Sequence, residues 1–217
     1  MIRACHINKR FRGLSVLRDV NLEAASGRIT LLTGANGSGK STLLKILAGL
    51  LQPDGGHASI GKCDVTRQRR TAQRQLSFLP QNVAFHPAST PERILAFYGR
   101  LRGVDATLRE RLLREFDLDG AAVRPVSKLS GGMLQRLGLA LALLPNASVL
   151  ILDEPGTGLD PEWRLALRER LVREANLGKT VLLTSHFPDE WAGAAHARFD
   201  CREGRIFPIP PTQALLP

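Results

Sequence analysis

One stretch decides the fold of this chain: Gly34-Ala35-Asn36-Gly37-Ser38-Gly39-Lys40-Ser41-Thr42. An apolar run at residues 29–33 precedes it, and a segment rich in leucine at residues 43–47 follows it. A strand, a glycine-rich loop and a helix in this order are the context that a phosphate-binding P-loop requires. Glycines adopt backbone angles that other residues resist, so successive N–H groups can converge on one anion. The stretch therefore predicts that the chain binds a nucleoside triphosphate.

Side chains of the P-loop have predicted roles of their own. The helix that begins near Lys40 adds its positive dipole end at the loop. We expect Lys40 to reach the outer phosphates and the Ser41 hydroxyl to ligate Mg²⁺. The predicted nucleotide-binding residues of this loop are Gly34, Asn36, Gly37, Ser38, Gly39, Lys40, Ser41 and Thr42.

A pair of carboxylates follows the most hydrophobic run of the chain. Residues 149–152 are continuously apolar, as in a parallel strand covered on both faces, and Asp153 and Glu154 come next. Asp153 lies where an α/β sheet places its ligand crevice, and a bound Mg²⁺ would explain a charge at that position. Glu154 points to the opposite side of the strand if the pleat continues. A carboxylate there can accept a proton from an attacking water.

Hydrophobic patterning predicts the other elements. We expect short strands over residues 1–33, a helix at 40–51, a strand at 76–79, helices from about 85 to 145, a helix at 162–175 and a strand at 181–184. Thr90 and Pro91 are suited to the N-cap and the first position of a helix. The proline-rich tail from Phe207 onward is expected to lack regular structure.

Composition favours one ordinary globular domain. The chain has 217 residues, of which 43% are hydrophobic and 23% charged. No apolar run approaches the roughly 20 residues that span a bilayer, and the N-terminus lacks the apolar core of a signal peptide. The cysteines Cys5, Cys63 and Cys201 are far apart in the sequence, which indicates reduced cytosolic thiols rather than disulfides or a zinc site.

The chain is basic, with a net charge of +10. Such an excess could suit nucleic acid, anionic lipid headgroups or an acidic partner. One cluster of arginines stands out, at Arg67, Arg69, Arg70 and Arg74. No aromatic residue interleaves with it as in a base-stacking platform. We therefore favour a solvated basic face near a membrane over a nucleic-acid site.

A third stretch, Leu129-Ser130-Gly131-Gly132-Met133-Leu134-Gln135-Arg136, resembles the signature sequence of the nucleotide-binding subunits of ABC transporters. Ser130 can cap the helix that follows, and the N–H groups beside Gly131 and Gly132 make a second anion site. The P-loop and the Asp153-Glu154 pair occur in the same order as in that family, so the resemblance covers nearly the whole chain.

The resemblance implies an α/β fold of the P-loop NTPase type. It consists of a RecA-like core with an N-terminal antiparallel β subdomain and an inserted α-helical subdomain. We expect a single ABC ATPase domain over residues 1–217, in which 1–84 and 146–217 form the nucleotide-binding core and 85–145 form the helical subdomain.

Further positions match the family pattern one by one. Gln81 resembles the Q-loop glutamine, which contacts Mg²⁺ and the attacking water, and His186 resembles the switch histidine that contacts the γ-phosphate. Asp160 resembles the D-loop aspartate at the dimer interface, and Phe11 is placed like the aromatic residue that stacks on adenine. Without the family, His186 would be a structural histidine and Asp160 a helix cap, and for Phe11 a place in the core stays open as the alternative.

Three features depart from the family pattern. The D-loop approach contains more glycine than expected, at Gly156 and Gly158. Arg93 occupies a position that is usually acidic, unless Glu92 substitutes for it. Pro188 follows His186 closely. The sequence also stops soon after residues 203–206, so a C-terminal regulatory domain is not expected.

The resemblance implies an ATPase with ATP and Mg²⁺ as cofactors. Two copies, or this chain and a homologous ATPase subunit, would pair head to tail, with ATP held by the P-loop and Asp153 of one and capped by Ser130 and Gly132 of the other. Such a subunit energises a separate transmembrane permease from the cytoplasmic face of the membrane. Residues 79–87 and 135–140 are similar to ABC-2-type exporters and to the ATPase of nitrous oxide reductase (copper) maturation. The alternative is a non-transport ABC ATPase that acts on ribosomes or nucleic acid.

Overall fold

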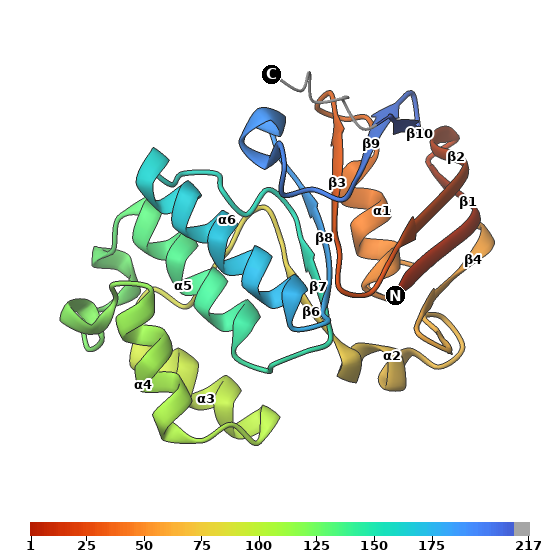
Figure 1. The fold of residues 1–217 in the computed structure, drawn as a ribbon. Helices are drawn as coiled ribbons and strands as arrows, with labels where there is room; N and C mark the ends of the chain where they lie inside the picture. The colour runs from red at the N-terminus through yellow and green to blue at the C-terminus, as the bar shows by residue number, and fades with distance from the viewer. Residues whose placement is uncertain (211–217) are drawn as a thin grey trace.

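The computed structural model describes residues 1–210 of the chain (Figure 1). The strands are β1 (Ile2–Phe11), β2 (Leu14–Ala24), β3 (Ile29–Gly34), β4 (Gly55–Ile60), β5 (Cys63–Asp64), β6 (Leu76–Leu79), β7 (Val149–Leu152), β8 (Thr180–Thr184), β9 (Ala197–Arg202) and β10 (Arg205–Ile209). The helices are α1 (Lys40–Leu47), α2 (Arg69–Gln75), α3 (Pro91–Arg102), α4 (Ala106–Glu115), α5 (Gly131–Leu143) and α6 (Pro161–Asn176). Short 3₁₀ helices are η1 (Asp119–Ala121), η2 (Val126–Lys128) and η3 (Pro188–Trp191).

The central sheet has the strand order β10-β9-β3-β8-β7-β6, and every neighbouring pair is parallel except β10 and β9. Strands β7 and β8 are buried along their whole length, because helices lie on both faces of the sheet. In Figure 1, α5 and α6 lie on one side of these strands and α1 on the other. A P-loop α/β fold was predicted, and the structure confirms it.

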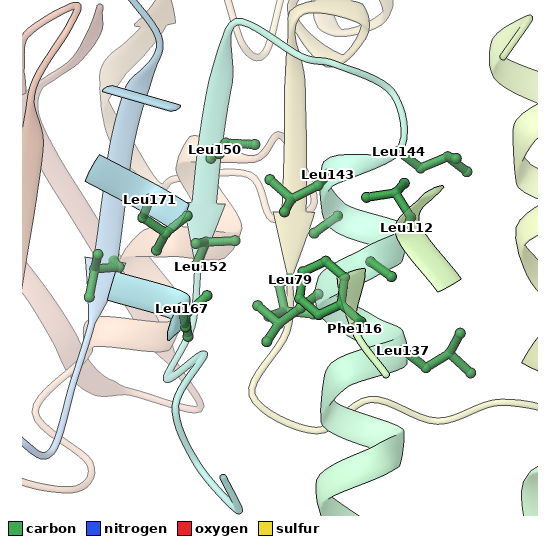
Figure 2. Close-up of a cluster of buried hydrophobic side chains, with 14 of the residues drawn as sticks. Leu79, Leu112, Phe116, Leu137, Leu143, Leu144, Leu150, Leu152, Leu167 and Leu171 are labelled. Atoms are coloured by element: carbon green, nitrogen blue, oxygen red, sulfur yellow. The ribbon is translucent and has the colours of Figure 1, made fainter. Parts of the chain in front are cut away.

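Alternate residues of each central strand enter two different hydrophobic clusters, as the pleat requires. In β7, Leu150 and Leu152 pack with helices α4, α5 and α6, whereas Val149 and Ile151 pack with α1 and the N-terminal strands. Figure 2 shows the first cluster, in which Phe116 of the segment after α4 reaches toward Leu79. Burial of each such side chain stabilises the fold by about 1.5–3 kcal/mol.

The N-terminal strands form a second sheet, in the order β2-β1-β4-β5. Strands were predicted over residues 1–33 and are present, and β3 is short as expected, but β1 and β2 have 10 and 11 residues and are longer than predicted. The two strands pair with several register shifts, between Ala4 and Ile7 among others. Such irregularities interrupt the period-2 alternation by which a long strand is recognised in a sequence.

Two predicted ends are also corrected. Helix α1 ends at Leu47 rather than at 51, because Gly49 has a φ of 66° and closes the helix in the left-handed region. The chain from Phe207 to Ile209 is not a loose end but part of β10, where Pro208 pairs with Phe199. Because β10 is an edge strand, the missing N–H of Pro208 is tolerated. The rest of the predicted loose end, residues 211–217, lies outside the described residues.

Other predicted elements agree with the structure. The Thr90 side chain caps α3 by accepting a hydrogen bond from the Arg93 amide at 3.3 Å, and Pro91 is the first helical residue. Helices α3, α4 and α5 come between β6 and β7 in the chain and lie together at one side of the molecule (Figure 1). In the part of the chain that the structure describes, no helix has the length and apolar character needed to cross a bilayer.

Candidate active site

Four loops meet at one edge of the central sheet. The P-loop follows β3, Gln81 follows β6, Asp153 and Glu154 follow β7, and His186 follows β8. These strands are parallel and end in register, since Leu79 pairs with Leu152, Leu152 with Leu183, and Leu32 with Thr184. The carboxyl ends of parallel strands therefore bring residues far apart in the sequence to one crevice.

The P-loop encloses the ammonium group of Lys40. The Lys40 ammonium donates hydrogen bonds to the carbonyl oxygens of Gly34 at 2.8 Å and Ala35 at 3.0 Å. Only 6% of Lys40 is exposed, so its charge is confined to the start of α1. Gly39 precedes the helix with a φ of 111°, and a Cβ there would lie 2.8 Å from Leu17 Cδ2. The loop requires glycine at this position both for its backbone angle and for its closeness to β2.

A cavity of about 200 Å³ opens beside this loop. Its lining residues are Val16, Asn36, Gly37, Gly39, Lys40, Ser41, Thr42, Gln81 and Glu154. The Ser38 hydroxyl is buried nearby and has no hydrogen-bond partner among residues 1–210. A buried ammonium, a helix N-terminus and an unpartnered hydroxyl in one place fit an anionic ligand.

The two carboxylates after β7 differ in their partners. The Asp153 carboxylate is 1% exposed and accepts a hydrogen bond from the Thr184 hydroxyl at 2.8 Å. The same hydroxyl accepts a hydrogen bond from the Glu154 amide at 2.7 Å. The pleat of β7 does not continue, because Glu154 has a φ of 51° in the left-handed region. This turn, and not strand alternation, therefore sets the direction of the Glu154 side chain.

Glu154 connects the Q-loop and the switch loop. One carboxylate oxygen accepts a hydrogen bond from the Gln81 side-chain amide at 2.9 Å, and the other lies 2.8 Å from His186 Nε2. Thr157 Oγ1 makes a longer contact of 3.4 Å. The Glu154 side chain is 5% exposed, whereas that of His186 is 40% exposed. A carboxylate held in this way at the edge of a cavity is placed to accept a proton from a molecule inside it.

The signature segment and Asp160 both cap helices. Ser130 Oγ accepts a hydrogen bond from the Met133 amide at 3.2 Å, and Asp160 Oδ1 accepts one from the Trp163 amide at 2.9 Å. The start of α5 packs against the loop after Glu154, since the Gln135 side-chain amide donates to the Pro155 carbonyl at 2.9 Å. Ser130, Gly131 and Gly132 do not line the P-loop cavity of the same chain.

Phe11 lies at the end of β1, opposite Leu14, and is 45% exposed. It is therefore not a core residue. The Lys9 ammonium lies 5.4 Å from the centre of its ring. Phe11 does not line the P-loop cavity, but Val16 of the same hairpin does.

Comparison with known proteins identifies the family. A family model described as "ABC transporter" matches residues 17–157, which is more than half of the chain. This chain belongs to the ABC transporter family. It is an ATP-binding cassette, the component of an ABC transporter that binds and hydrolyses ATP.

Named relatives of the cassette include an ATP-binding protein of Nod factor export and one of daunorubicin resistance. The Nod factor export ATP-binding protein I of Burkholderia thailandensis is 38% identical over 92% of this chain and 67% of its own length. The daunorubicin resistance ATP-binding protein DrrA2 of Streptomyces coeruleorubidus is 38% identical over 87% of this chain and 60% of its own length. The cassette thus spans about two thirds, or less, of the length of these relatives. A solved structure titled as a dimeric bacterial ABC transporter cassette matches with a TM-score of 0.83 and 25% identity, and covers 95% of this chain and 96% of that chain.

Two residues of the cassette, Thr184 and Cys201, make contacts that were not foreseen from its sequence. Thr184 ties Asp153 to Glu154, and the signal for it was a hydroxyl at the end of a buried strand directly before Ser185-His186. Cys201 Sγ donates a hydrogen bond to the Ser38 carbonyl at 3.0 Å. Burial raises the pKa of this thiol above its ordinary value of 9.0, so it stays protonated and able to donate. No sequence signal indicated Cys201, because its strand, β9, was not recognised.

Proposed function

We propose that this cassette powers export through a separate membrane permease, and that it hydrolyses Mg²⁺-ATP between two copies arranged head to tail. The observation that carries the proposal is the Glu154 carboxylate, which is held by Gln81 and His186 at the edge of the P-loop cavity. In this arrangement Glu154 is the general base, and Gln81 and His186 orient it toward a water beside the γ-phosphate.

The P-loop supplies the phosphate contacts. Lys40 would replace its hydrogen bonds to the Gly34 and Ala35 carbonyls with bonds to phosphate oxygens. Its buried ammonium group would therefore stay hydrogen-bonded. The N–H groups at the start of α1 and the buried Ser38 hydroxyl add further donors. Phe11, exposed at the tip of its hairpin, is available to stack on the adenine ring.

The residues also fit a magnesium ion whose ligands come partly from the protein and partly from the nucleotide phosphates. Among residues 1–210, no three His, Cys, Asp or Glu side chains could hold a metal by themselves. Mg²⁺ commonly takes only one or two carboxylates together with phosphate oxygens. Ser41, Asp153 and Gln81 would hold the ion, which neutralises charge on the phosphates when bound. Thr184 donates to one oxygen of Asp153, which leaves the other oxygen as the candidate ligand.

A second copy would complete the site. At the start of α5, away from the P-loop cavity of the same chain, Ser130 is exposed and Gly132 is half-buried, and Asp160 is also exposed. If the signature helix of one copy faces the P-loop of the other, two helix N-termini share one triphosphate. The dimeric cassette among the similar structures supports this arrangement.

The proposed binding site for the permease is an apolar groove. It has a volume of about 360 Å³ and is lined by Leu50, Phe78, Val83, Tyr98 and Leu141, among others. Pro80 and Val83, which flank Gln81, belong to this lining. We propose that an apolar cytoplasmic segment of the permease occupies the groove, because its movement would then reach Gln81 directly. We therefore propose that the chain acts at the cytoplasmic face of the membrane.

The name of the Nod factor export relative, and the similarity of residues 79–87 to ABC-2-type exporters, support export as the direction of transport. The similarity to the ATPase of nitrous oxide reductase maturation makes the permease of such a copper system one candidate partner. The basic charge is compatible with nucleic acid, but no aromatic residue interleaves with the arginines at 67, 69, 70 and 74 as in a base-stacking platform.

The test is to purify the tagged cassette from detergent-solubilised membranes and to identify what accompanies it. We expect Mg²⁺-dependent phosphate release and a polytopic membrane protein in stoichiometric amount. Tyr98→Ala in the groove should release that protein, whereas Leu177→Ala, an exposed leucine at the end of α6, should not. Recovery of ribosomes or nucleic acid in place of a membrane protein would contradict the proposal.

A further inference from the structure

Arg164, in the first turn of α6, contacts two loops that carry the proposed catalytic pair. Its Nη1 donates a hydrogen bond to the Leu159 carbonyl at 2.8 Å, and its Nε donates one to Glu190 Oε1 at 2.8 Å. The guanidinium carbon lies 4.5 Å from the centre of the Phe187 ring. The Arg164 side chain is only 19% exposed.

The first contact holds the segment that leads from Glu154 to α6. This segment is a succession of tight turns, in which the Thr157 amide bonds to the Glu154 carbonyl and the Leu159 amide to the Gly156 carbonyl. The stem of Arg164 packs beside it, since a Cβ on Gly156 would lie 3.4 Å from Arg164 Cδ. The Arg164 guanidinium thus holds the end of this segment at Leu159, five residues after Glu154.

The other contacts hold the segment that follows His186. Phe187, the next residue, lies against the face of the guanidinium, and Glu190 in η3 accepts from its edge. Phe187 is 44% exposed and does not belong to either hydrophobic cluster, so the Arg164 guanidinium is a main contact of its ring. Arg164 therefore fixes the position of the residue that directly follows the switch histidine.

We propose that Arg164 is a positioning residue, which sets the geometry of the Glu154–His186 pair. It would couple the D-loop (residues 155–160) to the switch loop (residues 185–187). The inference rests on the proposed roles of Glu154 and His186. A planar guanidinium can present two edges and a face at once, and an ammonium group cannot. Movement of the D-loop when a second copy binds would then reach Phe187, the residue after His186, through the Arg164 side chain, in addition to the direct contact between Glu154 and His186.

The chain offers a matched control. Arg168 lies one turn further along α6 and donates to the Ala192 carbonyl at 3.0 Å, at the far end of the same 3₁₀ segment. Among the contacts of the described residues, it touches neither the D-loop carbonyl nor Phe187. Loss of Arg168 removes a similar charge from the same helix face and leaves the proposed coupling intact.

The experiment measures kcat and KM for ATP, the equilibrium Kd for ATP and the melting temperature of the variants. Arg164→Ala and Arg164→Lys should both lower kcat on the order of 10- to 100-fold, the cost of a small misplacement of reacting groups. The Kd for ATP should stay within about twofold, since the P-loop is untouched. Arg168→Ala should keep the wild-type kcat. Glu190→Ala should lower kcat, and combining it with Arg164→Ala should add no further loss.

Wild-type turnover in Arg164→Lys would overturn the inference. So would equal losses of kcat, ATP affinity and melting temperature in Arg164→Ala, because they would indicate a structural role only. His186→Ala separates this inference from the proposed function. If His186→Ala turns over normally, the role proposed for His186 fails; if it is inactive while the Arg164 variants are normal, only the positioning role fails.

Discussion

The imidazole Nε2 of His186 lies 2.8 Å from a carboxylate oxygen of Glu154. The two residues follow neighbouring parallel strands, and Thr184 joins these strands at their ends through bonds to Asp153 and Glu154. The contact therefore arises from strand register and one hydroxyl, and not from a mobile loop alone. It gives the proposed base a defined direction.

Lys40→Ala should weaken ATP binding. A hydrogen bond from a charged donor contributes about 1.5–3 kcal/mol, so the Kd should rise roughly 10- to 100-fold. Lys45→Ala is the control, because Lys45 is an exposed lysine of the same helix. Isothermal titration calorimetry with Mg²⁺-ATP measures both. Equal affinities of the two variants would contradict the assignment of the P-loop cavity as the ATP site.

Gly34→Ala should destabilise the fold and impair nucleotide binding together. Gly34 has a φ of 137°, and a Cβ there would lie 2.3 Å from the Cys201 carbonyl oxygen. The strained backbone and the clash should cost about 1–3 kcal/mol of the free energy of unfolding. Gly120→Ala is the matched control, since nothing lies within 4 Å of a Cβ at Gly120. Denaturant melts test the difference, and a wild-type midpoint for Gly34→Ala would refute the close approach of β9 to the P-loop.

Cys201 should be the last thiol to be alkylated. Burial raises its pKa above 9.0, whereas Cys5 and Cys63 are partly exposed. Iodoacetamide at pH 8 followed by mass spectrometry should modify Cys5 and Cys63 first. Because the folded chain holds this proton more tightly than the unfolded chain, the thiol's contribution to stability is complete below pH 9.0 and is lost as the pH rises through the raised pKa. Cys201→Ser should reduce that loss, and an unchanged dependence on pH would contradict the argument.

Much of the fold could be predicted because the local signals agree with the global structure. The apolar runs before the P-loop and before Asp153 are buried parallel strands, and the Thr90-Pro91 pair begins a helix as its chemistry requires. Prediction failed where local patterning is interrupted. The bulged strands β1 and β2 lack clean alternation, and Pro208 concealed an edge strand.

The location of the site could be predicted from the sequence, but the contacts inside it could not. Sequence order placed Gln81, Asp153 and His186 after strands, but only the sheet register brings them to one crevice. Thr184, Cys201 and Arg164 act through contacts between segments distant in the chain, and no local pattern encodes such contacts. The left-handed turn at Glu154 was also unforeseen, because glutamate is not a residue type that favours it.

Glu154→Gln tests the central claim most directly. The amide keeps the size of the carboxylate but cannot accept a proton from water, so turnover should fall by at least 100-fold. ATP binding should persist, because the P-loop is unchanged, and size-exclusion chromatography with Mg²⁺-ATP should reveal a stable dimer. A Glu154→Gln variant that releases phosphate at the wild-type rate, or stays monomeric with ATP bound, would contradict the account.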